Sequence, residues 1–158
     1  MHVACVRGRG EVVECLLENG ARVDLVDRQG DTALHWLATT GEAELVEVLL
    51  NNRAPFERRN ARGRTPLMTA VQCGRREVVL YLLQRGAQVN AVDCDGNAAL
   101  HLACLAKSPG MIQTLLQRNA ERSLVNKDKC TPLDLCPREH AHLLDDPSNN
   151  DPCDFTET

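Results

Sequence analysis

The stretch NARGRTPLMTAVQCGRREVVLYLLQRGAQVNAV, residues 60–92, contains one complete structural unit. Gly63 predicts a turn, because glycine tolerates the positive φ that a tight turn often needs. Thr65 and Pro66 predict a helix start, since a threonine hydroxyl accepts a free backbone N–H at the N-cap and proline has no N–H to lose at the first helical position. An apolar stripe then predicts a second helix over about residues 76–85. The unit is therefore a turn, a short helix, a longer helix and an extended exit.

The same unit recurs along the chain at a step of 33 residues. A strict period of this length is typical of stacked-repeat proteins, in which a unit buries its apolar face only against its neighbours. We therefore predict one elongated domain rather than a single compact core. The positions that keep the step include Leu34, Leu67, Leu100 and Leu133, and also Ala21, Ala54, Ala87 and Ala120.

Four segments carry a specific resemblance: DRQGDTALHWLA at 27–38, GRTPLMTA at 63–70, DCDGNAALHLA at 93–103 and TPLD at 131–134. Together they make the chain resemble the ankyrin repeat family over roughly residues 1–144. The resemblance implies an all-α ankyrin-repeat solenoid, built from helix-turn-helix units that are joined by β-hairpin-like turns. It also implies a scaffold or adaptor that binds other proteins on its concave face and is not an enzyme.

The period divides the chain into six segments. We expect the N-terminal unit to be truncated and the chain to be a fragment, because the turn and helix cap that should precede the first helix are missing. Terminal repeats are usually atypical and polar, which fits the last unit. The segments are a truncated first unit at 1–26, full units at 27–59, 60–92 and 93–125, a degenerate capping unit at 126–144, and an acidic tail at 145–158 that we expect to be disordered.

Composition narrows the range of functions. The formal net charge is only −4 and aromatic residues make up 3% of the chain, which gives no case for nucleic acid binding by charge or by base stacking. No apolar run approaches the length that a membrane span needs. Without a secretory signal, the eight cysteines are interpreted as reduced thiols of an intracellular protein, in the cytoplasm, the nucleus or both.

No residue pattern supports catalysis, a cofactor or a metal. The chain has no Gly-rich phosphate loop and no catalytic serine or zinc-protease motif. The resemblance implies that His35 and His101 are structural, each ring bonded near the cap of its helix and to the adjacent turn. The spacing of Cys130, Cys136, His140 and His142 fits no compact zinc pattern. Trp36 is predicted to be a core residue between repeats.

Arginines gather where the second and third units meet, and two interpretations of them stay open. They form either a solvated charged surface or an electropositive site for an acidic peptide segment, since guanidinium groups suit carboxylates and phosphates. By resemblance, hairpin tips and exposed inner-helix positions line the concave binding face. The predicted partner-binding residues are Arg28, Gln29, Asp31, Arg59, Arg62 and Arg64 on the tips, with Gln72 and Leu105 on the inner helices.

Asn90 resembles the hairpin asparagine that intracellular asparaginyl hydroxylase modifies in ankyrin repeats, although Gln88 replaces the usual acidic residue two positions earlier. Its simpler interpretation is a turn residue that hydrogen-bonds to its own backbone.

Three further hypotheses remain at this level. The chain is a targeting arm of a larger enzyme, such as a ubiquitin ligase, kinase or lipase, or it self-assembles through its first unit, although we expect a monomer. The third hypothesis is that acidic residues of the tail at 145–158 occupy the arginine tips and inhibit binding.

Overall fold

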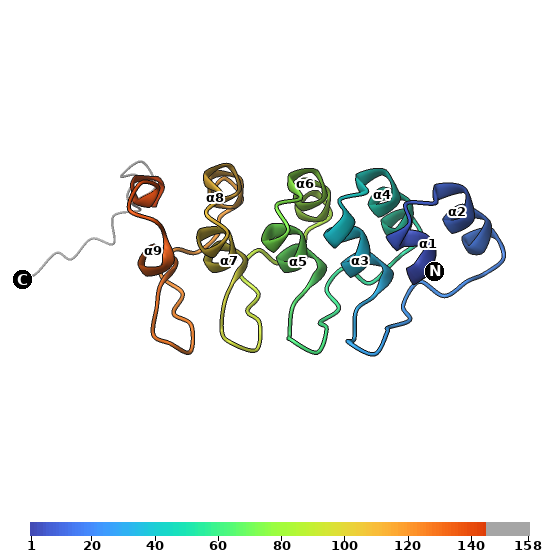
Figure 1. The fold of residues 1–158 in the computed structure, drawn as a ribbon, viewed down its shortest axis with the longest axis horizontal. Coiled ribbons are helices and arrows are strands. Elements are labelled where there is room, and N and C mark those ends of the chain that lie inside the picture. Colours follow the sequence, from blue (N-terminus) through green and yellow to red (C-terminus); the bar gives the residue numbers. More distant parts are fainter. Residues whose placement is uncertain (145–158) are drawn as a thin grey trace, which may run out of the picture.

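The computed structural model describes residues 1–144, and this part of the chain is an all-α repeat solenoid, as predicted (Figure 1). Two rows of helices run along the stack, and the loops between successive units project from it on one side (Figure 1). The inner row consists of α1 (His2–Val6), α3 (Ala33–Thr40), α5 (Pro66–Gln72), α7 (Ala99–Leu105) and α9 (Pro132–Leu135). The outer row consists of α2 (Gly10–Glu18), α4 (Ala43–Asn51), α6 (Arg76–Gln84) and α8 (Pro109–Leu116), and the 3-10 turn Ala141–Leu143 ends the stack.

The helices α3, α5, α7 and α9 start at the position of the cap that Thr65 predicts for the third unit. In α5 the Thr65 hydroxyl accepts the backbone N–H of Met68 at 3.4 Å, and Pro66 occupies the first turn. In α3 the His35 ring takes part in the cap, because its Nδ1 accepts the backbone N–H of Thr32 at 3.1 Å. Its Nε2–H then donates to the Arg64 carbonyl oxygen of the next unit at 2.9 Å. The predicted structural role of this histidine is confirmed, and it includes a bond between units.

Two buried histidines make stability depend on pH. Burial lowers the pKa of His35 and His101 below 6.5, because the apolar surroundings disfavour the charged ring. The unfolded chain takes up these protons more readily, so their contribution to stability is full above about pH 6.5 and is lost as the pH falls through the lower folded-state values. Between pH 6.5 and pH 5 we expect urea unfolding to show a loss of at most about 2 kcal/mol for each ring.

The control for this pH prediction removes both titrating rings. The His35→Gln/His101→Gln variant should be less stable at pH 7, but its free energy of unfolding should change less between pH 7 and pH 5 than that of the wild type. An equal loss in the two proteins would show that other groups cause the pH dependence.

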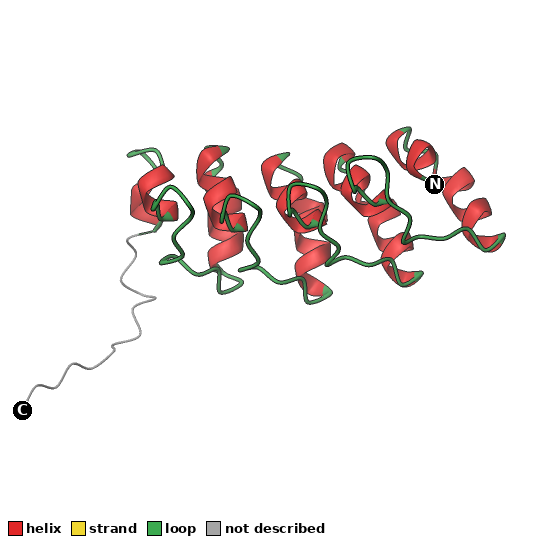
Figure 2. Ribbon diagram, turned by 90° about the horizontal axis from the view of Figure 1, so that it is seen from below, coloured by secondary structure: helices red, strands yellow, loops and turns green. Residues whose placement is uncertain are grey.

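The hairpins between units are held by one side chain that recurs with the period. In the third unit Asn60 Oδ1 accepts the backbone N–H groups of Arg62 and Arg64, each at 3.0 Å, and so closes the turn. Asp27, Asp93 and Asn126 do the same in the other units. Neighbouring hairpins therefore have matching shapes and lie side by side, as Figure 2 shows from below.

Hairpins also bond directly to the next hairpin. The backbone N–H of Ala61 donates to the Gln29 carbonyl oxygen at 2.9 Å, and the Cys94 N–H donates to the Arg62 carbonyl oxygen at 3.0 Å. This close approach leaves no space at Gly63, whose φ is +71° and whose added Cβ would lie 2.8 Å from the Cys94 nitrogen. The turn therefore needs glycine for its conformation and for the closeness of its neighbour.

One continuous core runs along the stack. Leu49, Leu82 and Leu115 keep the step of 33 residues and are fully buried between inner and outer helices. Trp36 differs from the prediction, because it is only partly buried and its indole N–H donates to Asp27 Oδ2 at 3.0 Å. A buried or half-buried indole N–H needs a hydrogen-bond acceptor, and the hairpin carboxylate supplies one.

The two ends of the described stack differ from its middle. Val12 of the first unit is 42% exposed, although the equivalent Leu45 is only 7% exposed because the preceding unit covers it. At the other end α9 stops before Pro137, and residues 126–144 add only the short 3-10 turn instead of a full outer helix. The hypothesis about the acidic tail concerns residues 145–158, which lie outside the described residues.

Arg53 adopts the left-handed conformation that its position predicts, with φ of 59° after α4, where the equivalent Gly86 has 87°. We expect Arg53→Gly to raise the free energy of unfolding by about 1 kcal/mol, because a residue with a Cβ pays for this conformation and glycine does not. Urea unfolding measures the gain. As control, Arg53→Ala removes the charge but keeps the Cβ and should leave stability nearly unchanged; an equal gain from both variants would assign the effect to the charge.

Candidate functional site

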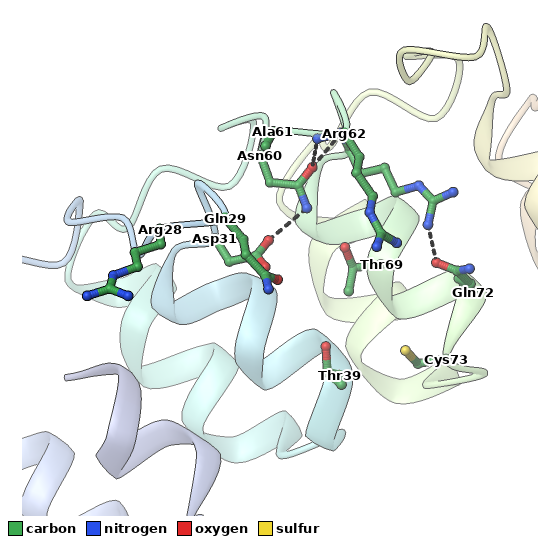
Figure 3. A pocket seen from close by; sticks show the side chains of 11 residues that line it. Arg28, Gln29, Asp31, Thr39, Asn60, Ala61, Arg62, Thr69, Gln72 and Cys73 are labelled. Carbon is green, nitrogen blue, oxygen red and sulfur yellow. Dashed lines mark hydrogen bonds between the residues drawn. The ribbon is translucent and has the colours of Figure 1, made fainter.

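A hollow of about 460 Å³ opens where the hairpins and inner helices of the second and third units meet (Figure 3). Hairpin residues form one side of it, and the C-terminal halves of α3 and α5 form the other. Six predicted partner-binding residues line this hollow: Arg28, Gln29, Asp31, Arg62, Arg64 and Gln72. The other lining residues are Thr39, Asn60, Ala61, Thr69 and Cys73.

Asn60 fixes the geometry at the centre of the hollow. While its Oδ1 closes its own hairpin, its Nδ2 donates to Asp31 Oδ1 of the preceding unit at 2.7 Å (Figure 3). The Asp31 carboxylate is therefore held in place at the junction. The two hairpins carry their exposed tips, which include Arg28 and Arg62, on one hydrogen-bonded frame.

Arg64 belongs partly to the structure of the solenoid. Its Nε donates to Asp93 Oδ2 of the next unit at 3.2 Å, and the two side chains are only 14% and 1% exposed. A second N–H of the guanidinium bonds to the Gln72 side-chain oxygen on α5. Its positive charge is therefore balanced inside the protein. Arg64 lines the hollow, but its guanidinium is already bonded to Asp93 and Gln72.

Arg28 and Arg62 supply the available positive charge. Both side chains are exposed, and within residues 1–144 neither guanidinium has a hydrogen-bond or ion-pair partner. Around the hollow, Arg28, Arg62 and Arg64 stand against the carboxylates of Asp31 and Asp93, which leaves one net positive charge. The arrangement suits the binding of an anionic group with a single charge.

Two predicted residues lie elsewhere. Arg59 does not line the hollow, because its guanidinium bonds to the carbonyl oxygens of Gly63 and Val92 and so ties the end of the second unit to the third. Leu105 lines a second hollow of about 200 Å³ at the next junction along the stack. The structure thus brings together most of the predicted tip residues but separates these two from them.

Asn90 makes its hydrogen bonds with the following unit and not with its own backbone. Its Oδ1 accepts the backbone N–H of Glu121 at 2.8 Å, and its Nδ2 donates to the Asn119 carbonyl oxygen at 3.4 Å. In the preceding unit Glu57 bonds in the same way to the backbone N–H of Gln88. Asn90 is exposed, and its side chain joins two units; its hydroxylation stays a prediction.

The predicted partner-binding residues did not include five of the lining residues: Thr39, Asn60, Ala61, Thr69 and Cys73. Asn60 could have been found, because Asp27, Asp93 and Asn126 share its position and all are residues that close turns through a side-chain oxygen. Ala61 and Thr69 have no distinctive sequence signal. They line the hollow because the backbone places them there.

The thiols and the remaining titratable groups show no second site. Burial raises the pKa of Cys5 to about 11 and that of Cys104 to about 12, so both thiols stay protonated at neutral pH. Burial alone would raise the pKa of Asp27, but N–H groups of Asp31, Gln29 and Trp36 hold it below its usual value. In residues 1–144 no three His, Cys, Asp or Glu side chains are grouped to hold a metal ion.

Among the described residues, no helix has both the length and the apolar character that a bilayer span requires. The fold defines a helical repeat protein, built from stacked units of two helices and a hairpin. A family model described as "Ankyrin repeats (3 copies)" matches residues 1–93, and a second, "Ankyrin repeats (many copies)", matches residues 75–116. The chain therefore belongs to the ankyrin repeat family, whose repeats generally act as protein–protein interaction modules and are typically non-catalytic. No curated protein matches the sequence.

Proposed function

We propose that this chain is a non-catalytic binding module and that the hollow between its second and third units holds an acidic segment of a partner protein. The observation that supports this function is the pair of exposed guanidinium groups, Arg28 and Arg62, on hairpins that Asn60 and Asp31 join. An acidic segment that lies over the hollow would face both cations without breaking any bond of the solenoid.

The charge of the hollow favours a carboxylate over a phosphate group. One net positive charge remains when Arg64 is paired with Asp93 and the Asp31 carboxylate is counted. A glutamate or aspartate of the partner would neutralise this charge. A phosphate group, with nearly two negative charges at neutral pH, would in addition be repelled by the fixed Asp31 carboxylate.

The test selects ligands from a displayed library of random peptides with the wild type and with the Arg28→Glu/Arg62→Glu variant. We expect the wild type to enrich peptides with Asp or Glu, and the variant to bind those peptides about 10–100-fold more weakly. The matched control is Arg53→Glu/Arg118→Glu, which makes the same change of charge after the outer helices and should select like the wild type. Equal enrichment of acidic peptides by all three proteins would overturn the proposal.

A second variant tests whether a positive electrostatic potential in the hollow attracts the peptide. Asp31→Asn removes one negative charge but keeps an oxygen for Asn60, as in the pair of Asn97 and Asn126 two units on, where Asn126 Nδ2 donates to Asn97 Oδ1 at 2.8 Å. We expect it to bind the selected acidic peptides about 2–5-fold more tightly than the wild type. Weaker binding would contradict a site that recognises anions.

A further inference from the structure

We infer that the partner segment continues beyond this hollow and places a large apolar side chain on Leu105, about three residues from its acidic side chain. This inference rests on the proposed function and adds to it the chemistry of a second contact. It assigns to the partner an extended segment in which one carboxylate and one large apolar side chain are both required.

The second hollow is the neighbour of the first along the concave face. It lies at the junction of the third and fourth units, and Asn97, Leu102, Leu105 and Ala106 contribute to its lining. Its volume of about 200 Å³ is enough for one large side chain. Arg64 and Gln72 line both hollows, so the hydrogen-bonded pair that they form belongs to the wall between them.

Leu105 gives the second hollow a character different from that of the first. It lies at the last residue of α7 and is 52% exposed, although every other leucine of α7 is buried. The equivalent residues of the two preceding units, Thr39 and Gln72, are polar and line the first hollow. Water contact with this much of a leucine side chain is unfavourable, and a partner's apolar group would remove it.

The spacing of the two contacts follows from the stacking of the helices. The first hollow lies at the junction of α3 and α5, and the second lies at the junction of α5 and α7. Packed helices lie about 8–10 Å apart, so the two hollows are separated by about this distance along the stack. An extended peptide advances about 3.3 Å per residue, which places the two partner side chains about three residues apart. The Arg64–Asp93 pair keeps the wall between them neutral, so the segment crosses it without meeting an unbalanced charge.

The experiment uses two peptides that contain the spacing in both chain directions, Leu-Ser-Ser-Glu-Ser-Ser-Leu and Ser-Ser-Ser-Glu-Ser-Ser-Ser. Their binding to isotope-labelled protein is followed by NMR, which measures weak affinities and observes the methyl groups of Leu105. With the wild type we expect the leucine peptide to bind about tenfold more tightly than the serine peptide, because one leucine side chain becomes partly buried. Its addition should shift the Leu105 methyl signals.

The decisive variant is Leu105→Gln, which gives the fourth unit the residue that the third unit carries at Gln72. It should remove the advantage of the leucine peptide and leave the affinity for the serine peptide unchanged. If the leucine peptide keeps its advantage, or never has one, the inference is overturned. The inference is also overturned if the NMR signals of the free wild type broaden with protein concentration while those of Leu105→Gln do not. Leu105 would then contact a second copy of the chain.

The Arg28→Glu/Arg62→Glu variant tests the proposed function separately, through its affinity for the serine peptide. Loss of serine-peptide binding in this variant supports the acidic site even if Leu105→Gln has no effect. Unchanged binding of the serine peptide, or no binding of it to the wild type, overturns the proposed function and removes the basis of the inference.

Discussion

Gly63→Ala is expected to lower the free energy of unfolding by about 2–5 kcal/mol, against only about 1–2 kcal/mol for Gly74→Ala. The two glycines have almost the same φ, +71° and +69°, so a Cβ carries the same conformational cost at both. They differ in their neighbours. A Cβ at Gly63 would lie 2.8 Å from the Cys94 nitrogen of the next hairpin, whereas no atom lies within 4 Å of one at Gly74.

Urea unfolding of the two variants beside the wild type measures both effects. The excess loss in Gly63→Ala isolates the cost of pushing two hairpins apart, because the conformational cost cancels in the comparison. Equal losses would show that the hairpins separate easily and that their contact contributes little to stability.

The second large effect concerns the pair of Arg64 and Asp93. Asp93→Asn is expected to cost about 3–5 kcal/mol, because it leaves a largely buried guanidinium without its carboxylate. Arg64→Asp should also be destabilising, since it sets two carboxylates against each other at the same place. The double variant Arg64→Asp/Asp93→Asn should recover most of the loss, because it recreates the carboxylate–amide pair of the preceding junction. There Asn60 Nδ2 donates to Asp31 Oδ1 at 2.7 Å.

A double-mutant cycle of urea unfolding energies tests this compensation. We expect a coupling energy of at least about 2 kcal/mol, in the range found for groups in one hydrogen-bonded network. Losses that simply add in the double variant would mean that the two residues act independently, and the interpretation of the junction as a matched pair would be wrong.

Much of the fold follows from the sequence because the period is strict. Thr65 and Pro66 identify the start of a helix locally, and the buried leucines at 49, 82 and 115 follow from repetition of one apolar stripe. The left-handed turn at Arg53 was also predictable, since glycine stands at the same place in two other units.

The site was predictable only in part, because a side chain's partner depends on the unit beside it. Arg59 and Arg62 look alike in the sequence, but the Arg59 side chain finds two backbone carbonyl oxygens and the Arg62 side chain finds none among the described residues. Trp36 is likewise drawn to a carboxylate that lies nine residues earlier in the chain. The repeat period does not predict these hydrogen-bond partners, because it gives the equivalent positions of the units but not the contacts that each side chain makes.

The pairs between neighbouring hairpins have a consequence for the order of the units. Each junction uses a different chemical combination: Asp31 with Asn60, Arg64 with Asp93, and Asn97 with Asn126. If the third unit were cut out, Asp31 would face Asp93 and two acids would repel; if the fourth were cut out, Arg64 would face an uncharged amide. The repeats share one shape but are not interchangeable. The side-chain pairs at their junctions therefore favour one order of the units, and a stack with a unit left out would lose a matched pair.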